Sequence, residues 1–101
     1  GPLVVVHPFD TEADAVALAN DTPYGLNAMV FTENLHKAHR VSAALDAGTV
    51  WVNCFFIRDL RAPFGGFGDS GVGREGGNFS RDFFTEPKAV VMQITPADPE
   101  A

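Results

Sequence analysis

The chain opens with a continuous apolar run and then changes to a helical pattern. Residues 3–6 are all apolar and mostly β-branched, which predicts a strand buried on both faces, as in a parallel sheet. Residues 11–20 follow as a predicted helix, because Thr11 can form a capping box with Asp14 three residues later. Pro23 has no N–H to donate, so this helix ends before it.

The next segment repeats the alternation of strand and helix. Residues 26–32 and 49–53 are predicted strands, and a helix capped by Asn34 lies between them. The apolar positions of this helix recur at helical spacing, at Leu35, Ala38, Val41 and Leu45. Gly48 is expected at the left-handed position that follows a helix. The order strand–helix–strand–helix–strand predicts an α/β fold with parallel strands joined by crossover helices.

This regularity ends after Asn53. Residues 65–77 hold seven glycines in thirteen positions, which predicts a loop that is ordered only if other parts of the protein pack over it. A short helix around residues 79–84 and a last strand at 88–94 are expected next. The remaining residues contain two prolines and two acids, so 96–101 are predicted to form a flexible tail.

Composition narrows the possible functions. The 101 residues, 46% apolar and 20% charged, suit one domain or a piece of a larger one. A formal charge of -6 argues against binding to nucleic acid. The sequence contains no run of 18 apolar residues, so it predicts no membrane-spanning helix. A single cysteine allows no internal disulfide, and with no evident leader this favours the cytoplasm. The Gly1-Pro2 start can be a protease scar or the interior of a longer chain, and the motifs described below favour the second.

Two overlapping Gly-x-Gly-x-x-Gly matches occupy residues 66–71 and 71–76. A dinucleotide-binding loop needs a strand directly before these glycines and a helix after them. Residues 61–64 contain Pro63 and cannot form a central strand. A structural glycine loop is therefore predicted, and a small nucleotide binder remains an alternative.

Cysteine and histidine do not combine into an evident reactive site. Cys54 closes a predicted strand, but no histidine lies within ten residues to hold it as a thiolate, which predicts a buried, inert thiol. His36 and His39 share one helix face without a third ligand, so we expect solvated side chains and no metal site.

Two arginines stand in an apolar stretch just beyond a strand end. Arg58 and Arg61 carry the side chain best suited to bind a carboxylate through two hydrogen bonds in a partly dry pocket. One interpretation is that one of the two faces a ligand. The other is that Asp59 or another acid pairs with them.

Five motifs in unbroken order resemble the C-terminal part of an NAD(P)-dependent aldehyde dehydrogenase. They lie at residues 1–6, 17–26, 47–53, 63–66 and 70–76. The likeness covers about residues 1–95. It implies that 1–87 form the C-terminal part of the catalytic domain and that 88–95 form an oligomerisation strand, which pairs with a neighbouring subunit in a homo-oligomer.

The resemblance also implies what this chain contributes to the reaction. In the family, a cysteine thiolate attacks the aldehyde, hydride passes to the nicotinamide, and a glutamate activates water to release the acid. These residues and the nucleotide-binding half lie upstream of the matched motifs, so no catalytic residue is expected here. NAD or NADP is expected to bind the full-length protein and not this chain alone, which should be inactive.

Residues 53–61 resemble the dehydrogenases that act on hydroxymuconate-type semialdehydes, formed by ring cleavage of catechols. Such substrates carry carboxylates, and the resemblance implies that Arg58 binds one. It places Cys54 on the wall of the substrate tunnel with Phe64 close by. The alternative from another class is a non-catalytic interaction module whose last strand adds to a partner's sheet.

Overall fold

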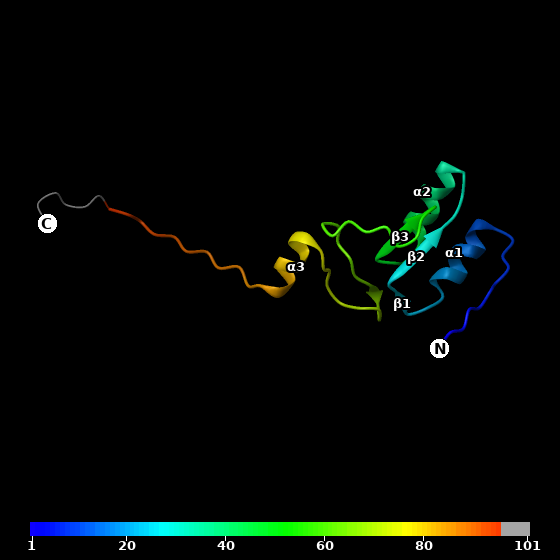
Figure 1. Ribbon diagram of the computed structural model, residues 1–101, viewed down its shortest axis with the longest axis horizontal. Helices are drawn as coiled ribbons and strands as arrows, with labels where there is room; N and C mark the ends of the chain where they lie inside the picture. The colour runs from blue at the N-terminus through cyan, green and yellow to red at the C-terminus, as the bar shows by residue number, and fades with distance from the viewer. Residues whose placement is uncertain (96–101) are drawn as a thin grey trace, which may run out of the picture.

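The computed structural model describes residues 1–95. An α/β body spans most of the first half of the chain, and a looser segment follows it (Figure 1). In chain order the elements are α1 (Glu12–Asn20), β1 (Tyr24–Gly25), β2 (Asn27–Val30), α2 (Leu35–Ala44), β3 (Thr49–Val52), β4 (Phe67–Gly68) and α3 (Gly77–Phe84).

The central unit is β2–α2–β3, and its two strands are parallel, as the sequence predicted. Asn27 lies opposite Thr49 and Val30 opposite Val52, so four residues of each strand are paired. Both strands are shorter than expected from the apolar pattern. Helix α2 makes the crossover and packs against both strands and against α1, which is the arrangement that joins parallel neighbours.

The helix starts follow the predicted capping. The Asp14 N–H donates to the Thr11 hydroxyl at 3.1 Å, and the Thr11 N–H donates to the Asp14 carboxylate at 3.1 Å, which completes a capping box. The Asn34 side chain accepts from the Lys37 N–H at 2.9 Å and caps α2. Because these bonds span only three residues, local sequence is enough to specify them.

The prediction for Gly48 was wrong. Helix α2 ends at Ala44 with Leu45 as its C-cap, and the left-handed glycines lie elsewhere in the chain. Glycine is required at position 48 because the backbone of the glycine-rich loop passes over it. A Cβ atom there would lie 1.7 Å from the Gly65 carbonyl oxygen.

Residues 3–6 do not form the predicted buried strand. Their side chains are between 65% and 85% exposed, and the described part of the chain offers them no neighbouring strand. An apolar β-branched run has strand propensity, but a strand is stable only when its backbone N–H and C=O groups find partners.

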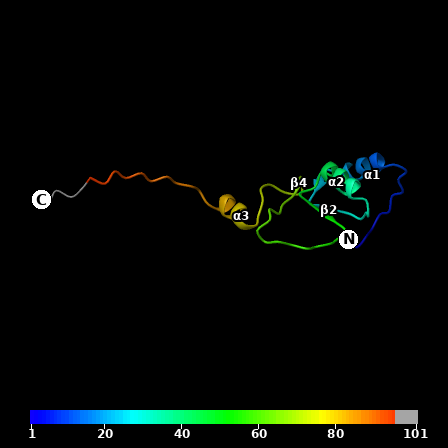
Figure 2. The same ribbon diagram turned by 90° about the horizontal axis from the view of Figure 1, so that it is seen from above.

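The last predicted strand is also absent from the described chain. Residues 86–95 leave α3 and run away from the body without pairing (Figures 1 and 2). The expected pairing with a neighbouring subunit stays a prediction, since it needs a second chain. Residues 96–101, predicted as a flexible tail, lie outside the described residues.

The described chain buries little apolar surface by itself. Among its hydrophobic residues, only Trp51 and Ala38 are buried, at 7% and 8% exposed. The Cα radius of gyration is 22.6 Å, whereas a compact domain of about 100 residues measures about 13 Å. Within residues 1–95, no helix has the length and apolar character to cross a membrane.

Two polar links connect α1 to the following elements. The Arg40 guanidinium binds both carboxylate oxygens of Glu12, at 3.0 and 2.9 Å, and the bond from Arg40 lowers the pKa of Glu12. This pair is exposed and therefore adds little stability. The Asn20 amide donates to the Ala44 carbonyl at 2.9 Å and accepts from the Asp46 N–H at 2.9 Å, which ties α1 to the end of α2.

Replacing Asn20 by Ala should release the Asp46 N–H. We expect its hydrogen exchange to accelerate about five- to tenfold, because one such bond contributes about 1 kcal/mol. Asn20→Asp is the matched control, since it keeps an oxygen for Asp46 and loses only the donor to Ala44. Unchanged exchange in Asn20→Ala would show that the amide bond is not what protects this position.

Candidate functional site

The candidate site begins at the carboxyl end of β3, where Asn53 turns the chain. Asn53 has a left-handed φ of 53°, a conformation that asparagine tolerates better than most residues. Its side chain accepts from the Thr32 N–H and donates to the Thr32 carbonyl, both at 2.8 Å. The amide thus continues the ladder beyond the last backbone pair and aims the following residues away from the sheet.

Aromatic packing holds the turn that follows. Phe56 has a φ of 58°, which is unfavourable for a bulky side chain and costs about 1–3 kcal/mol. The buried Trp51 stabilises this conformation: its indole N–H donates to the Ile57 carbonyl at 2.9 Å, and its ring meets the Phe55 ring edge-on at 5.8 Å. Arg58 therefore leaves the turn from a defined backbone position.

Arg58 lies against Phe64, which directly precedes the glycine-rich loop, and against Glu75 within that loop. Its guanidinium carbon is 4.8 Å from the centre of the Phe64 ring, and Nη2 is 3.5 Å from a carboxylate oxygen of Glu75. Phe64 and Glu75 are paired to each other by two backbone hydrogen bonds of 2.8 Å. The structure thus brings together the predicted residues Arg58 and Phe64, and adds Glu75.

Arg61 has a different environment from Arg58. It forms an ion pair of 2.6 Å with Asp59, reinforced by bonds from Nε and from the backbone N–H of Arg61, both at 2.9 Å. The Arg61 guanidinium, and then its backbone N–H, lower the pKa of the Asp59 carboxyl, and Asp59 raises the pKa of Arg61. An acid therefore pairs with each arginine, tightly at Arg61 and loosely at Arg58.

Sequence reasoning did not identify Glu75 as part of this cluster. Asp59 and Arg61 are two positions apart, so their pairing could be considered from the sequence. Glu75 is 17 positions from Arg58, inside a glycine motif, and only the bridge to Phe64 brings it near. No pattern in the chain signals that contact.

Cys54 follows Asn53 and is a free thiol. It is half-buried, not buried as predicted, because little of the described chain packs over this turn. Among residues 1–95 it forms no hydrogen bond to Arg58 or Phe64. The contacts that the structure gives therefore join Arg58, Phe64 and Glu75.

Polar side chains of the glycine-rich loop bond to the loop's own backbone and to β1. The Arg74 guanidinium donates to the carbonyls of Gly66 and Gly73 at 2.9 and 2.7 Å, and the Ser70 hydroxyl accepts from the Gly25 N–H at 2.8 Å. The strand inside the loop, β4, is antiparallel to β1 and only two residues long. This differs from the parallel strand–loop–helix unit of the dinucleotide-binding fingerprint, so the two glycine motifs do not form that unit.

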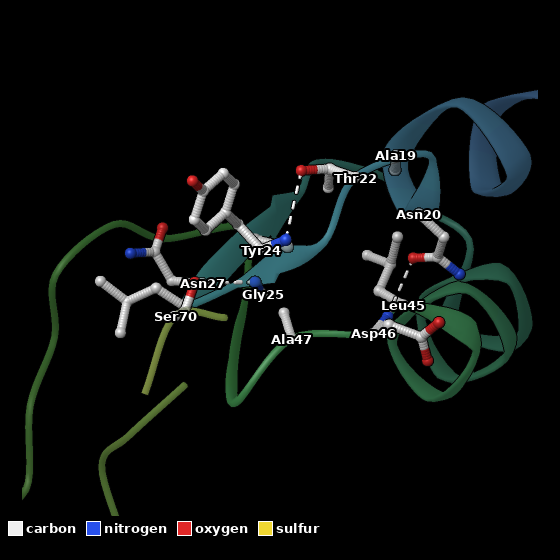
Figure 3. Close-up of a pocket in the computed structure, with 12 residues that line it drawn as sticks. Ala19, Asn20, Thr22, Tyr24, Gly25, Asn27, Leu45, Asp46, Ala47 and Ser70 are labelled. Carbon is white, nitrogen blue, oxygen red and sulfur yellow. Dashed lines mark hydrogen bonds between the residues drawn. The ribbon is translucent and has the colours of Figure 1, made fainter. Parts of the chain in front are cut away.

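A separate hollow of about 310 Å³ lies between α1, β1 and the end of α2 (Figure 3). Figure 3 shows Asn20 facing Asp46, and Thr22 turned toward the Tyr24 N–H. These polar groups bond to one another, and Gly25 is held by Ser70. The hollow lies where these elements meet, and the polar groups named here are already bonded to neighbouring residues.

Metal-binding groups are likewise dispersed. Within the described residues, no three His, Cys, Asp or Glu side chains lie close enough to hold an ion. His36 and His39 are exposed on α2, as predicted.

Comparison with known proteins identifies the family. Residues 1–90 match the aldehyde dehydrogenase family. This chain belongs to the aldehyde dehydrogenase family. It is 53% identical over 94 residues to a 2-hydroxymuconic semialdehyde dehydrogenase of a Pseudomonas species, covering 93% of this chain and 19% of that protein. It is 50% identical over 100 residues to a 2-aminomuconic 6-semialdehyde dehydrogenase, also from Pseudomonas, covering 99% of this chain and 20% of that one.

A solved structure of an aldehyde dehydrogenase from Bacillus cereus, in complex with NAD+, superposes with a TM-score of 0.84 at 45% identity. The match covers 94% of this chain and 19% of that one. The chain thus spans about one fifth of the length of these aldehyde dehydrogenases. The resemblance predicted from five motifs is confirmed at the level of the family.

The pairing of Asp59 with Arg61 can be tested by titration. The lowered pKa keeps Asp59 charged below the usual value of about 3.9, so the ion pair is complete above that value and is lost as pH falls through the lowered one. In Arg61→Gln, the pKa of Asp59 should rise toward the usual value, measured by carboxyl-carbon NMR. It should stay slightly low, because the backbone N–H at position 61 still donates.

The control for this titration is Arg58→Gln, which removes the other guanidinium of the segment. It should leave the Asp59 pKa unchanged. An equal rise in both variants would mean that general charge, not the specific pair, sets the pKa of Asp59.

Proposed function

We propose that this chain is the C-terminal part of a dehydrogenase that oxidises a carboxylate-bearing, muconate-type semialdehyde to the acid with NAD or NADP. Residues 1–87 supply wall of the substrate pocket, and Arg58 binds the substrate carboxylate. Cys54 and Phe64 line the same pocket. The names of the relatives support this substrate class, since two of them are dehydrogenases of muconic semialdehydes.

The observation that carries the proposal is the difference between the two arginines. Arg61 presents Nε and Nη2 to Asp59 in an ion pair of 2.6 Å, whereas in the described chain Arg58 makes one polar contact, at 3.5 Å. Its Nε and Nη1 donate no hydrogen bond within residues 1–95. A guanidinium has five N–H donors, and a substrate carboxylate can take two in parallel. The Phe64 ring beneath it holds the cation without using those donors.

The role of the described residues is binding and orientation. Arg58 fixes the carboxylate end of the substrate, which determines where the aldehyde end lies relative to reactive groups supplied by the rest of the enzyme. In this proposal the cofactor site belongs to that remaining part, as the resemblance to the family implies.

We also propose that residues 88–95 pair with a neighbouring subunit of a homo-oligomer. This segment carries a row of exposed apolar side chains, namely Val90, Val91, Met92 and Ile94. An unpaired apolar segment is a template for a partner strand. The interaction-module alternative uses the same segment and differs in needing no enzyme around it.

Arg58→Ala in the complete dehydrogenase should raise KM for a carboxylate-bearing semialdehyde about ten- to a hundredfold. That range corresponds to about 1.5–3 kcal/mol, the usual contribution of a charge-assisted hydrogen bond. An uncharged aldehyde should be nearly unaffected in steady-state assays. Arg61→Ala is the matched control and should leave KM for both aldehydes unchanged, because Asp59 binds Nε and Nη2 of Arg61. Equal losses for both aldehydes in Arg58→Ala would assign Arg58 a structural role.

The 101-residue chain alone should form no NADH when mixed with NAD and a series of aldehydes. The reason is that the family's catalytic cysteine, its catalytic glutamate and its nucleotide-binding half are expected to lie outside this chain. The complete dehydrogenase under the same conditions is the positive control, read by absorbance of the reduced nicotinamide. Protein-dependent NADH from the isolated chain would contradict the proposal.

A further inference from the structure

The Phe64–Glu75 bridge presents two different groups to one guanidinium. The residues lie opposite each other and exchange both backbone hydrogen bonds at 2.8 Å, so their side chains keep a fixed relative position. From this pair, the Phe64 ring meets the Arg58 guanidinium at 4.8 Å and the Glu75 carboxylate meets Nη2 at 3.5 Å. The ring supports the cation from its face, and the carboxylate contacts it at one nitrogen.

We propose that Glu75 is a positioning residue for substrate binding, which orients Arg58 so that its remaining donors face the substrate carboxylate. The inference rests on the function proposed above. A ring alone leaves a guanidinium free to rotate in its own plane, because the attraction to a ring face has no preferred in-plane direction. A carboxylate at one nitrogen removes that freedom before the substrate arrives.

The looseness of the contact matters for this role. Asp59 engages Nε and Nη2 of Arg61, the shortest ion-pair distance being 2.6 Å, and so occupies one edge of that guanidinium through which a ligand carboxylate could bind. Glu75 reaches only Nη2 of Arg58, and at 3.5 Å the bond is at the limit of hydrogen-bond length. Arg58 is thereby oriented and still able to donate elsewhere.

Exposure is consistent with a site that accepts a ligand. The side chains of Arg58 and Glu75 are 37% and 58% exposed, so neither is buried by the described chain. An ion pair in that setting contributes little to stability. Its removal should therefore affect binding more than folding, which makes the inference testable in the intact enzyme.

The test compares Glu75→Ala and Glu75→Gln in the complete dehydrogenase. For a carboxylate-bearing semialdehyde, Glu75→Ala should raise KM about three- to fivefold, the scale of one exposed charge pair, with kcat unchanged. Glu75→Gln keeps an oxygen that can accept from Nη2, so its KM should return to within about twofold of the wild type. An uncharged aldehyde should show the wild-type KM in both variants.

A double-mutant cycle ties the effect to Arg58. In an Arg58→Ala background, Glu75→Ala should change KM no further, because there is no guanidinium left to orient. Asp82→Ala is the matched control for the loss of an exposed, ion-paired acid and should leave KM for the carboxylate substrate unchanged. Should Glu75→Ala not fold, Glu75→Asp withdraws the carboxylate by one methylene and should give the same rise in KM.

Distinct outcomes separate this inference from the function on which it rests. If Arg58→Ala is selective for the carboxylate substrate but neither Glu75→Ala nor Glu75→Asp is, the positioning role is overturned and the proposed function stands. If Arg58→Ala itself shows no selectivity, the proposed function falls. A loss of kcat that is equal for both aldehydes in Glu75→Ala would also overturn the positioning role.

Discussion

The parallel pairing of β2 with β3 is the constraint on which the candidate site depends. It covers only four residues of each strand, and the Asn53 side chain extends it by bonding both backbone groups of Thr32. Asn53 also takes the left-handed conformation that turns the chain out of the sheet. Without the turn at Asn53, the backbone position of Arg58 relative to the sheet would not be defined.

The site itself is assembled from three positions between residues 58 and 75. The turn after β3 supplies Arg58, Phe64 directly precedes the glycine-rich loop, and Glu75 lies within that loop and pairs with Phe64. Glycine at position 48, directly before β3, lets that loop pass close to the start of the strand. The glycines therefore act in this chain as permissive backbone, and the charged and aromatic side chains between them make the contacts.

Local features of the fold could be predicted from the sequence with good accuracy. The caps at Thr11 and Asn34 act over three residues, and the helical spacing of apolar residues in α2 is a property of the segment alone. Residues 3–6 and 88–94 were harder, because strand propensity says nothing about where a partner strand lies. In the described chain neither finds one, and their apolar side chains stay exposed.

By itself, the sequence determined the order of helices and parallel strands, the motifs of an aldehyde dehydrogenase, and two arginines in an apolar stretch beyond a strand. Only the tertiary structure decided how those arginines differ. Asp59 lies two residues from Arg61 and binds one edge of its guanidinium. Arg58 contacts Glu75, which the backbone pairing of Phe64 with Glu75 brings near and which no local pattern encodes. Contacts within a few residues follow from backbone geometry, but contacts between distant segments depend on how the whole chain packs.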